Sequence, residues 1–328
     1  MKKRTIIIVV SVIVIALGSF IILNRKPAED PPVRCAFDTW LGYSSFYIAD
    51  ELGYFEDEQL DVELRIINPL QEKNVAMIKG DIDVMGGSID SAIISNSSGA
   101  SGQIVFVFEA SNGNDTLITS DDIKSAQDLE QQKIAVEIGY VSHLFLLHYL
   151  DLNGLSPDDV RIVDMPNDQS AAAFVSGGID AVSTWEPFTT QAMNRPDARI
   201  LASSKDMQPL FCGTLYASDK FIQEQPEKLR KLVTALLRAN AYWEANPVEG
   251  NKIVARRWNM PEQEVADIMV NTNLYTLEDQ HHLFGTDNEP GTLLEYLGIC
   301  DHLWRSAGEI ENEINHRNVF SGDFLPEE

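Results

Sequence analysis

A strand pattern followed by a helix pattern recurs along this chain, and the whole series runs twice. In the first series, residues 60–67 alternate apolar and charged side chains, the period of a strand, and a helix over 71–79 ends at Gly80. The second series starts with a strand at 133–136 and a helix at 142–152. Such alternation predicts a largely parallel sheet in each series, with helices as crossovers. A length of 328 residues suits two α/β lobes better than one core.

The chain must pass from one lobe to the other at two places. We expect these crossings near residues 117–119 and 215–218, since the second series lies between them. The sequence therefore predicts a two-lobed, hinged α/β protein, with lobe 1 formed by residues 33–117 and 216–328 and lobe 2 by residues 118–215. Strand ends and helix N-termini of both lobes would converge in an interlobe cleft, where folds of this kind bind ligands.

An uncharged, strongly apolar run precedes the first lobe. Residues 6–23 would rise about 27 Å as a helix, close to the thickness of a membrane hydrocarbon core. Signal-peptide apolar regions are usually shorter, so we expect residues 1–26 to be an uncleaved membrane anchor, with a cleaved signal as the alternative. Residues 27–32 hold three prolines and are typical of a linker. The folded part is then expected on the periplasmic or extracellular face, tethered to the cytoplasmic membrane.

Composition argues against several classes of function. The 50 Asp and Glu residues exceed the 25 Lys and Arg residues, and a net charge of −25 repels phosphate backbones, which disfavours nucleic-acid binding. Cys35, Cys212 and Cys300 are dispersed and match no metal-ligand spacing. The chain also lacks the GxSxG, HExxH, GxxxxGK[ST] and GxGxxG motifs. We therefore expect a monomeric binding protein without metal or cofactor, rather than an enzyme.

Several short phrases occur in a fixed order along the chain. They are Trp-Leu-Gly-Tyr at 40–43, Tyr-Ile-Ala at 47–49, Leu-Gly-Tyr-Phe at 52–55, Gly-Asp-Ile-Asp-Val at 80–84, Gly-Gly-Ile-Asp-Ala at 177–181 and Trp-Glu-Pro at 185–187. Over about residues 33–320, this set resembles the periplasmic solute-binding proteins of the nitrate, taurine/alkanesulfonate and thiamine-precursor (SsuA/THI5-like) group. The resemblance implies a type II periplasmic binding protein fold that closes on a small-molecule ligand by a hinge. It also implies an ABC permease and its ATPase as partners.

Three further phrases bear on the ligand. Residues 111–115, 137–143 and 184–187 look most similar to binding proteins encoded with urea-amidolyase-type systems, which implies a small nitrogenous solute. Taurine or another sulfonate, nitrate, a urea-like amide and a pyrimidine precursor all stay open. The group also includes thiamine-pyrimidine synthases, whose cysteine-rich, iron-linked motif this chain lacks. A related enzyme and a membrane-tethered ligand sensor are the alternatives to transport.

Loops that follow strands supply the candidate ligand-binding residues of lobe 1. Trp40 and Tyr43 would wall the cleft with aromatic faces, unless they only pack the first helix onto the sheet. Near Gly87 the backbone can approach a ligand closely, whereas Ser88 either contributes to the site or caps the following helix. Three polar residues beside the first crossing would either hydrogen-bond the ligand or form an ordinary turn: Asn112, Asn114 and Asp115.

The candidates of lobe 2 begin at the start of a helix. The first residues of this helix include Tyr140, Ser142 and His143, and Ser142 is the expected N-cap. The unpaired N–H groups in the first turn of the helix suit a carboxylate, sulfonate or carbonyl oxygen. His143 would add a donor or serve structure alone. Trp185 and Glu186 end a strand, and the resemblance places Glu186 against an amino, amidino or amide ligand, with a basic side chain of the protein as the alternative partner. Together these residues predict a ligand with an acceptor end and an N–H end.

Overall fold

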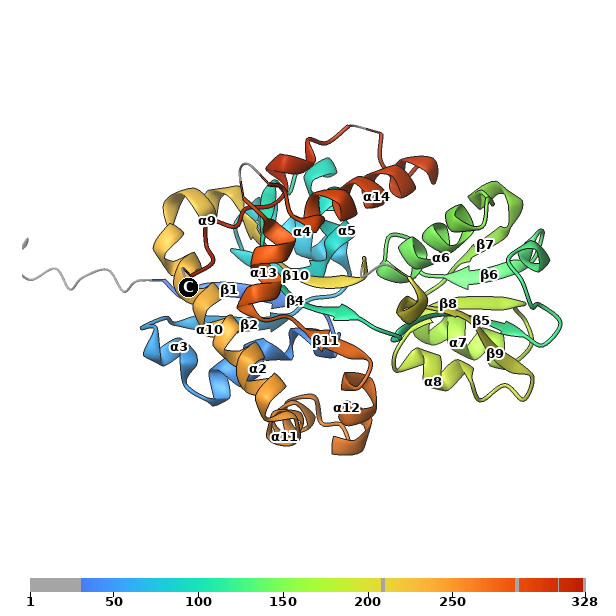
Figure 1. The fold of residues 1–328 in the computed structure, drawn as a ribbon, viewed down its shortest axis with the longest axis horizontal. Helices are drawn as coiled ribbons and strands as arrows, with labels where there is room; N and C mark the ends of the chain where they lie inside the picture. Colours follow the sequence, from blue (N-terminus) through green and yellow to red (C-terminus); the bar gives the residue numbers. More distant parts are fainter. Residues whose placement is uncertain (1–30, 208–209, 287–288, 312, 327–328) are drawn as a thin grey trace, which may run out of the picture. The chain divides into compact units, whose positions relative to one another are not determined.

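The computed structural model describes residues 31–207, 210–286, 289–311 and 313–326. Within these ranges the chain forms two separate β-sheets, each accompanied by helices (Figure 1). We call the parts built on these sheets the first and the second lobe. The α/β class and the two lobes predicted from the sequence are confirmed.

The first sheet has six strands in the order β11-β4-β10-β3-β1-β2. Strand β1 is parallel to β2 and β3, whereas β10 is antiparallel to both β3 and β4, and β11 is antiparallel to β4. The strands are β1 (Val33–Phe37), β2 (Val62–Ile66), β3 (Val84–Ser88), β4 (Gly102–Ser111), β10 (Cys212–Ser218) and β11 (Thr272–Leu274).

The second sheet has five strands in the order β7-β6-β8-β5-β9. Strand β6 is parallel to β7 and β8, whereas β5 is antiparallel to β8 and β9. The strands are β5 (Asp115–Ser120), β6 (Lys133–Val136), β7 (Arg161–Asp164), β8 (Ala181–Trp185) and β9 (Ala198–Ser203).

The prediction of largely parallel sheets needs a correction, because an antiparallel strand is inserted in each sheet. Strand β5 starts where the chain enters the second lobe, and β10 starts where it returns to the first. Each therefore begins at the edge where the parallel strands of its sheet end, and it must run in the opposite direction. The two inserted strands bring their first residues, Asp115 and Cys212, to the same edges as the carboxyl ends of their neighbours.

Helices fill the connections between strands and form most of the chain after β10. They are α2 (Ser45–Glu51), α3 (Tyr54–Asp57), α4 (Leu70–Lys79), α5 (Ile89–Ser97), α6 (Val141–Leu152), α7 (Asn167–Val175), α8 (Phe188–Ala192), α9 (Asp219–Glu224), α10 (Pro226–Ala245), α11 (Pro247–Trp258), α12 (Glu262–Met269), α13 (Leu277–Phe284) and α14 (Thr292–Ser306). The described ranges also contain 3₁₀ turns at Leu41–Ser44, Gln127–Leu129, Pro157–Asp159, Ser204–Asp206 and His316–Asn318.

Helix α14 packs against helices of both lobes. It contacts α5 in the first lobe and α6 in the second (Figure 1). Buried apolar side chains of all three helices, among them Ile93, Leu144 and Leu297, belong to one continuous cluster. The lobes are therefore joined by packed side chains as well as by the backbone.

The backbone passes between the sheets at two adjacent places. It leaves β4 after Ser111 and enters β5 at Asp115, and it returns between Ser203 and Cys212, a few residues before the crossings predicted from the sequence. The hydroxyl of Ser204 lies 2.8 Å from that of Ser111 and accepts a hydrogen bond from the backbone N–H of Gly113, also at 2.8 Å. Ser204 thus links the outgoing passage to the returning one.

The predicted membrane anchor, residues 1–26, and most of the predicted linker, residues 27–32, lie outside the described residues. The anchor therefore remains a prediction from the sequence. Within the described ranges, no helix has the length and apolar character needed to cross a membrane.

Strand β4 is completed along its outer edge by segments that come much later in the chain. Strand β11 pairs with Glu109–Ser111, and further along the edge the side chain of Gln280 takes the place of a strand. Its Oε1 accepts from the backbone N–H of Val107 at 3.0 Å, and its Nε2 donates to the Val107 carbonyl at 2.6 Å. Gln280 is fully buried, so both backbone groups of Val107 depend on it for their hydrogen bonds in this apolar region.

We expect Gln280→Ala to lower the free energy of unfolding by about 2 kcal/mol or more, because it leaves a buried N–H and a buried carbonyl without partners. Urea denaturation of the purified chain measures this loss. His282→Ala, on the exposed side of the same helix, serves as the control and should change stability by less than about 0.5 kcal/mol. Equal stability of the two variants would show that Gln280 does not support β4.

Candidate functional site

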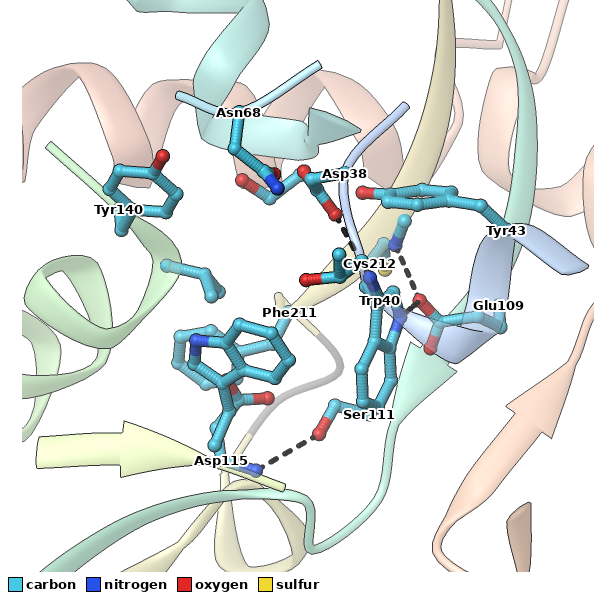
Figure 2. A pocket seen from close by; sticks show the side chains of 15 residues that line it. Asp38, Trp40, Tyr43, Asn68, Glu109, Ser111, Asp115, Tyr140, Phe211 and Cys212 are labelled. Atoms are coloured by element: carbon cyan, nitrogen blue, oxygen red, sulfur yellow. Dashed lines mark hydrogen bonds between the residues drawn. The ribbon is translucent and has the colours of Figure 1, made fainter. Parts of the chain in front are cut away.

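A pocket lies where strand ends of both sheets meet. It encloses about 620 Å³ of space, part of which is open to solvent (Figure 2). Residues of the first lobe follow β1 and β2, lie near the ends of β3 and β4, or precede and begin β10. Residues of the second lobe follow β6, end β8 or begin β5. The lining residues are Asp38, Thr39, Trp40, Tyr43, Asn68, Ser88, Glu109, Ser111, Asp115, Tyr140, Val141, Trp185, Phe211, Cys212 and Gly213. Carboxyl ends of strands at a change of topology are where open α/β sheets bind ligands.

Aromatic side chains form much of the pocket wall, and two of them connect the lobes. The rings of Trp40 and Trp185 meet edge to face, with centroids 5.7 Å apart and an interplanar angle of 90°. Tyr43 packs edge to face on Phe108, which fixes its ring at the first-lobe side. The indole N–H of Trp185 is buried and has no hydrogen-bond partner within the described residues. The wall thus offers aromatic faces and one unused donor.

Glu109 brings a carboxyl group into this pocket from near the end of β4. Its side chain is 1% exposed. The Oε1 atom accepts from the indole Nε1 of Trp40 at 2.9 Å and from the backbone N–H of Gly213 at 3.0 Å (Figure 2). The Oε2 atom is buried and has no partner within the described residues. Half of this carboxylate is therefore satisfied by the protein and half is not.

Two glycines make room for the Glu109 side chain. A Cβ at Gly213 would lie 2.5 Å from Oε1 of Glu109, and a Cβ at Gly42 would lie 2.7 Å from its Cγ. Both separations are shorter than a carbon atom tolerates, so any other residue at these positions would displace the carboxylate. The position of the Glu109 side chain thus depends on Gly42, Gly213 and Trp40 together.

Burial shifts the titration of three carboxyl groups in and beside the pocket. It raises the pKa of Glu109 from 4.5 to about 8 and that of Asp115 from 3.8 to about 7, and the nearby charge of Asp115 adds to the shift at Glu109. Burial also raises the pKa of Asp90, which lies in the first turn of α5 close to Ser88, to about 6. These groups resist ionisation because the surroundings are apolar and acidic.

A fourth carboxylate in the pocket is neutralised by the protein itself. Oδ2 of Asp38 lies 3.0 Å from Nζ of Lys73, which also donates to the Gly86 carbonyl at 2.7 Å. Lys73 is 2% exposed, so this is a buried ion pair behind the pocket wall. No lysine, arginine or histidine stands among the described residues that line the pocket.

Six of the twelve residues predicted from the sequence line this pocket. They come from five different loops or strand ends, as expected of a site built on loops: Trp40, Tyr43, Ser88, Asp115, Tyr140 and Trp185. The side chain of Ser88 makes no capping hydrogen bond to α5, although it occupies the N-cap position. Contact with a ligand stays a prediction for all six.

The other six predicted residues lie outside the lining, three of them in the first lobe or its crossing. Gly87 is buried inside β3, and its carbonyl accepts from the Thr214 hydroxyl at 2.8 Å. Asn112 donates its backbone N–H to the carbonyl of Asn271 at 2.8 Å. The amide of Asn114 donates to the same carbonyl and to the Thr272 hydroxyl, each at 2.8 Å. Asn112 and Asn114 therefore hold the crossing against β11.

Three more predicted residues belong to the second lobe. The N-cap of α6 is Tyr140, so the expectation that Ser142 caps this helix is wrong; Ser142 is buried in its first turn. The ring of His143 packs on Trp304 of α14 at 5.1 Å, and burial lowers its pKa to about 4. Glu186 accepts from the backbone N–H and the hydroxyl of Thr190, at 3.2 and 3.1 Å.

Sequence patterns did not reveal several lining residues, of which Glu109 carries the most chemistry. Residues 103–110 look like a continuous apolar strand, and Glu109 is the one charged residue in it. A lone carboxylate inside a buried strand is a signal that was available, since charged groups are seldom buried without a partner or a function. Phe211, Cys212 and Gly213 escaped notice because they precede or begin an antiparallel strand that the pattern did not reveal.

Within the described residues, no group of three or more histidine, cysteine or acidic side chains is arranged to hold a metal ion. The pocket offers instead aromatic faces, hydroxyls, two carboxylates without basic partners and one unused indole donor. This combination can bind a small solute and orient it by hydrogen bonds.

The raised pKa of Glu109 predicts how stability depends on pH. The folded chain keeps this proton up to a pKa of about 8, whereas the unfolded chain loses it near the ordinary value of 4.5. Unfolding therefore releases a proton between these values, and the free energy of unfolding falls as pH rises through this range, by up to ~1.4 kcal/mol per pH unit for this group. We expect Glu109→Gln to lose that part of the slope.

Urea denaturation at about pH 5.5, 6.5 and 7.5 measures the slope for each chain. Glu244→Gln changes an exposed carboxylate on α10 and should keep the wild-type slope. A Glu109→Gln chain with the wild-type slope would contradict the burial of an ionisable group at this position.

Comparison with known proteins assigns this chain to a family. The family described as "NMT1/THI5 like" matches residues 41–250. A protein of Brucella abortus (strain 2308) named as a binding protein is 26% identical over 337 residues, 99% of each chain. The taurine-binding periplasmic protein of Escherichia coli (strain K12) is 26% identical over 218 residues, 62% of this chain and 66% of its own.

A solved structure supports the same assignment at the level of the fold. The periplasmic aliphatic sulphonate binding protein SsuA of Escherichia coli superimposes with a TM-score of 0.75 at 17% identity, over 89% of this chain and 92% of its own. At that identity the likeness concerns the fold, which is the two-lobed periplasmic binding protein fold. The resemblance seen in the sequence is confirmed, and this chain belongs to the NMT1/THI5-like family.

Proposed function

We propose that this chain is the extracytoplasmic solute-binding component of an ABC importer, and that it binds a small nitrogen- or sulfur-containing solute in the pocket between its lobes. The observation that carries the proposal is the pocket itself, which takes residues from the strand ends of both lobes. A solute held by both lobes stabilises their approach, and this is how a two-lobed protein couples binding to closure. The permease and the ATPase of the importer would recognise the closed form.

The names of several relatives support this proposal. Matching proteins of Escherichia coli and Bacillus subtilis are named for binding taurine or aliphatic sulfonates. Those names describe binding proteins rather than enzymes, and taurine, other sulfonates, nitrate and urea-like amides are the candidate solutes for this chain. The acidic surface, with a net charge of −25, suits a secreted or tethered soluble domain.

Closure in this proposal uses the two crossings as the hinge. Residues 112–114 and the segment around Ser204 are the only described backbone that runs directly from one sheet to the other. Gly113 has a φ of 127°, a value open to glycine, so this position tolerates backbone rotation that other residues resist. The Ser204 hydrogen bonds would keep the two hinge strands together while the lobes rotate.

A thermal-shift screen of the purified full-length chain in detergent tests the proposal. The panel contains sulfonates, nitrate, urea-like amides, an aminopyrimidine and small organic cations. A solute at about a hundred times its dissociation constant should stabilise the folded chain by roughly 2.7 kcal/mol, which raises the melting temperature measurably. If no compound of any charge class shifts the transition, the solute-binding role is refuted.

We expect Trp185→Ala to weaken binding of the identified solute by about tenfold or more, because the variant removes an aromatic wall that both lobes share. Isothermal titration calorimetry measures the dissociation constant. Tyr54→Ala removes an aromatic ring on the first lobe away from the pocket, so it should bind with the wild-type constant. A Trp185→Ala chain with unchanged affinity would show that the solute binds elsewhere.

We also propose that residues 1–26 anchor the chain in the cytoplasmic membrane, on the strength of their apolar run. The expected result is that the chain stays with the membrane pellet after alkaline carbonate extraction. A chain recovered in the soluble fraction, shortened at its N-terminus, would point to a cleaved signal instead.

A further inference from the structure

The described residues that line the pocket include acidic side chains and no basic ones, which disfavours an anionic solute. Asp38, Glu109 and Asp115 line it, and no basic side chain does so within the described residues. Lys73 neutralises Asp38 at 3.0 Å, which leaves Glu109 and Asp115 without a basic partner. Among the described residues that line this space, no basic side chain compensates the charge of a sulfonate or nitrate, and the ionised fraction of Glu109 and Asp115 repels such an anion.

One oxygen of the Glu109 carboxyl group has no partner from the protein within the described residues. Trp40 and Gly213 donate to Oε1, whereas Oε2 is buried and has no partner in the described part of the chain. A buried carboxylate oxygen without a donor is costly, and the cost is removed when a bound molecule supplies an N–H. Asp115, 4% exposed at the start of β5, adds a second buried carboxylate from the other lobe.

The aromatic walls favour the same sign of charge. The pocket that holds these carboxylates is also lined by Trp40, Tyr43, Tyr140, Trp185 and Phe211. The face of an aromatic ring attracts a cation, and the attraction is strongest when the cation is desolvated. Aromatic rings together with carboxylates form the usual environment of a bound organic cation.

Two donors in the pocket favour an anion or an acceptor atom, but their positive charge is small. The N-terminus of α6 reaches the pocket at Tyr140 and Val141, and the indole N–H of Trp185 is also free to donate. A helix N-terminus carries only about half a positive charge. Once a bound cation has displaced their protons, the two carboxylates carry more charge than the helix N-terminus and outweigh its contribution. The Trp185 donor remains available to an acceptor atom elsewhere on the solute.

We propose that the solute is a small organic cation with N–H donors, such as an ammonium, amidinium or guanidinium compound, whose charged group binds between Glu109 and Asp115. This inference rests on the proposed solute-binding function and narrows its substrate class. The cation would donate to Oε2 of Glu109 and to the carboxylate of Asp115, and the aromatic rings would cover its faces. Because the two acids belong to different lobes, binding would also draw the lobes together.

Three planar, Y-shaped molecules of similar size isolate the effect of charge: guanidinium, urea and nitrate. We expect calorimetry at constant ionic strength to show guanidinium binding the full-length chain at least about tenfold more tightly than urea, and nitrate and taurine more weakly still. Potassium chloride at the same concentration controls for charge without N–H donors. Tighter binding of urea, nitrate or taurine than of any organic cation would overturn the inference and leave the solute-binding role intact. The absence of binding by every class would instead refute that role.

Glu109→Gln tests the residue that carries the inference. The variant should bind the cation at least about tenfold more weakly, because an amide supplies no charge to the ion pair. Its melting temperature, measured without solute, shows whether it is folded. Glu244→Gln, remote from the pocket on α10, should bind as the wild type does. A folded Glu109→Gln chain with wild-type affinity for the cation would overturn the inference.

Proton release gives an independent measurement. The titratable groups that face Glu109 are Asp115, Tyr43, Cys212 and Tyr275, and none of them is basic. Because burial raises the pKa of Glu109 and Asp115, the empty pocket holds protons that a cation must displace. The affinity for the cation should therefore rise from about pH 6 to about pH 8, by up to about tenfold per pH unit for each proton released. Calorimetry in two buffers of different ionisation enthalpy counts those protons. A cation affinity that is independent of pH and buffer would mean that it does not bind at these carboxylates.

Discussion

The hydroxyl of Ser204 joins the two passages of chain that run between the sheets. It lies 2.8 Å from the Ser111 hydroxyl on the outgoing passage and accepts from the Gly113 N–H at the same distance. With the passages held side by side, the carboxyl ends of the parallel strands in both sheets open toward one space. Residues as distant in sequence as Trp40, Glu109, Tyr140 and Trp185 therefore meet in one pocket. The pocket is a product of the topology before it is a product of any side chain.

Within that space, the buried position of Glu109 lowers the stability of the empty chain and favours ligand binding. The described residues supply two donors to one oxygen of this carboxylate and none to the other. A fully satisfied or apolar residue at this position would stabilise the empty chain, since an incompletely bonded buried acid costs free energy. Local arrangements of this kind persist at binding sites because a ligand completes them. Gly42 and Gly213 show the same compromise, as each leaves space that the Glu109 side chain occupies together with a neighbouring aromatic ring.

The sequence predicted the architecture better than it predicted the chemistry of the site. Period and spacing were enough for the lobes and for loop residues such as Trp40 and Trp185, because those signals are local. The single charge of Glu109 in an apolar strand was a local signal, but the direction of its side chain depends on pairing with β10, which follows it by the length of the second lobe. His143 looked like a donor at a helix start, but its ring packs on Trp304 of a helix that appears only near the end of the chain. Contacts of this range are not encoded in any short window of residues.

Among the described residues, two ring contacts that include tryptophan connect the lobes. Trp40 meets Trp185 at 5.7 Å, and Trp304 meets His143 at 5.1 Å. The remaining tryptophans, Trp243 and Trp258, pack within the first lobe. Intrinsic tryptophan fluorescence should therefore report the separation of the lobes. Rotation of one lobe would expose the indoles of Trp40, Trp185 and Trp304 to water and change their emission, whereas Trp243 and Trp258 would give a constant background. The motion can then be followed without attaching a dye.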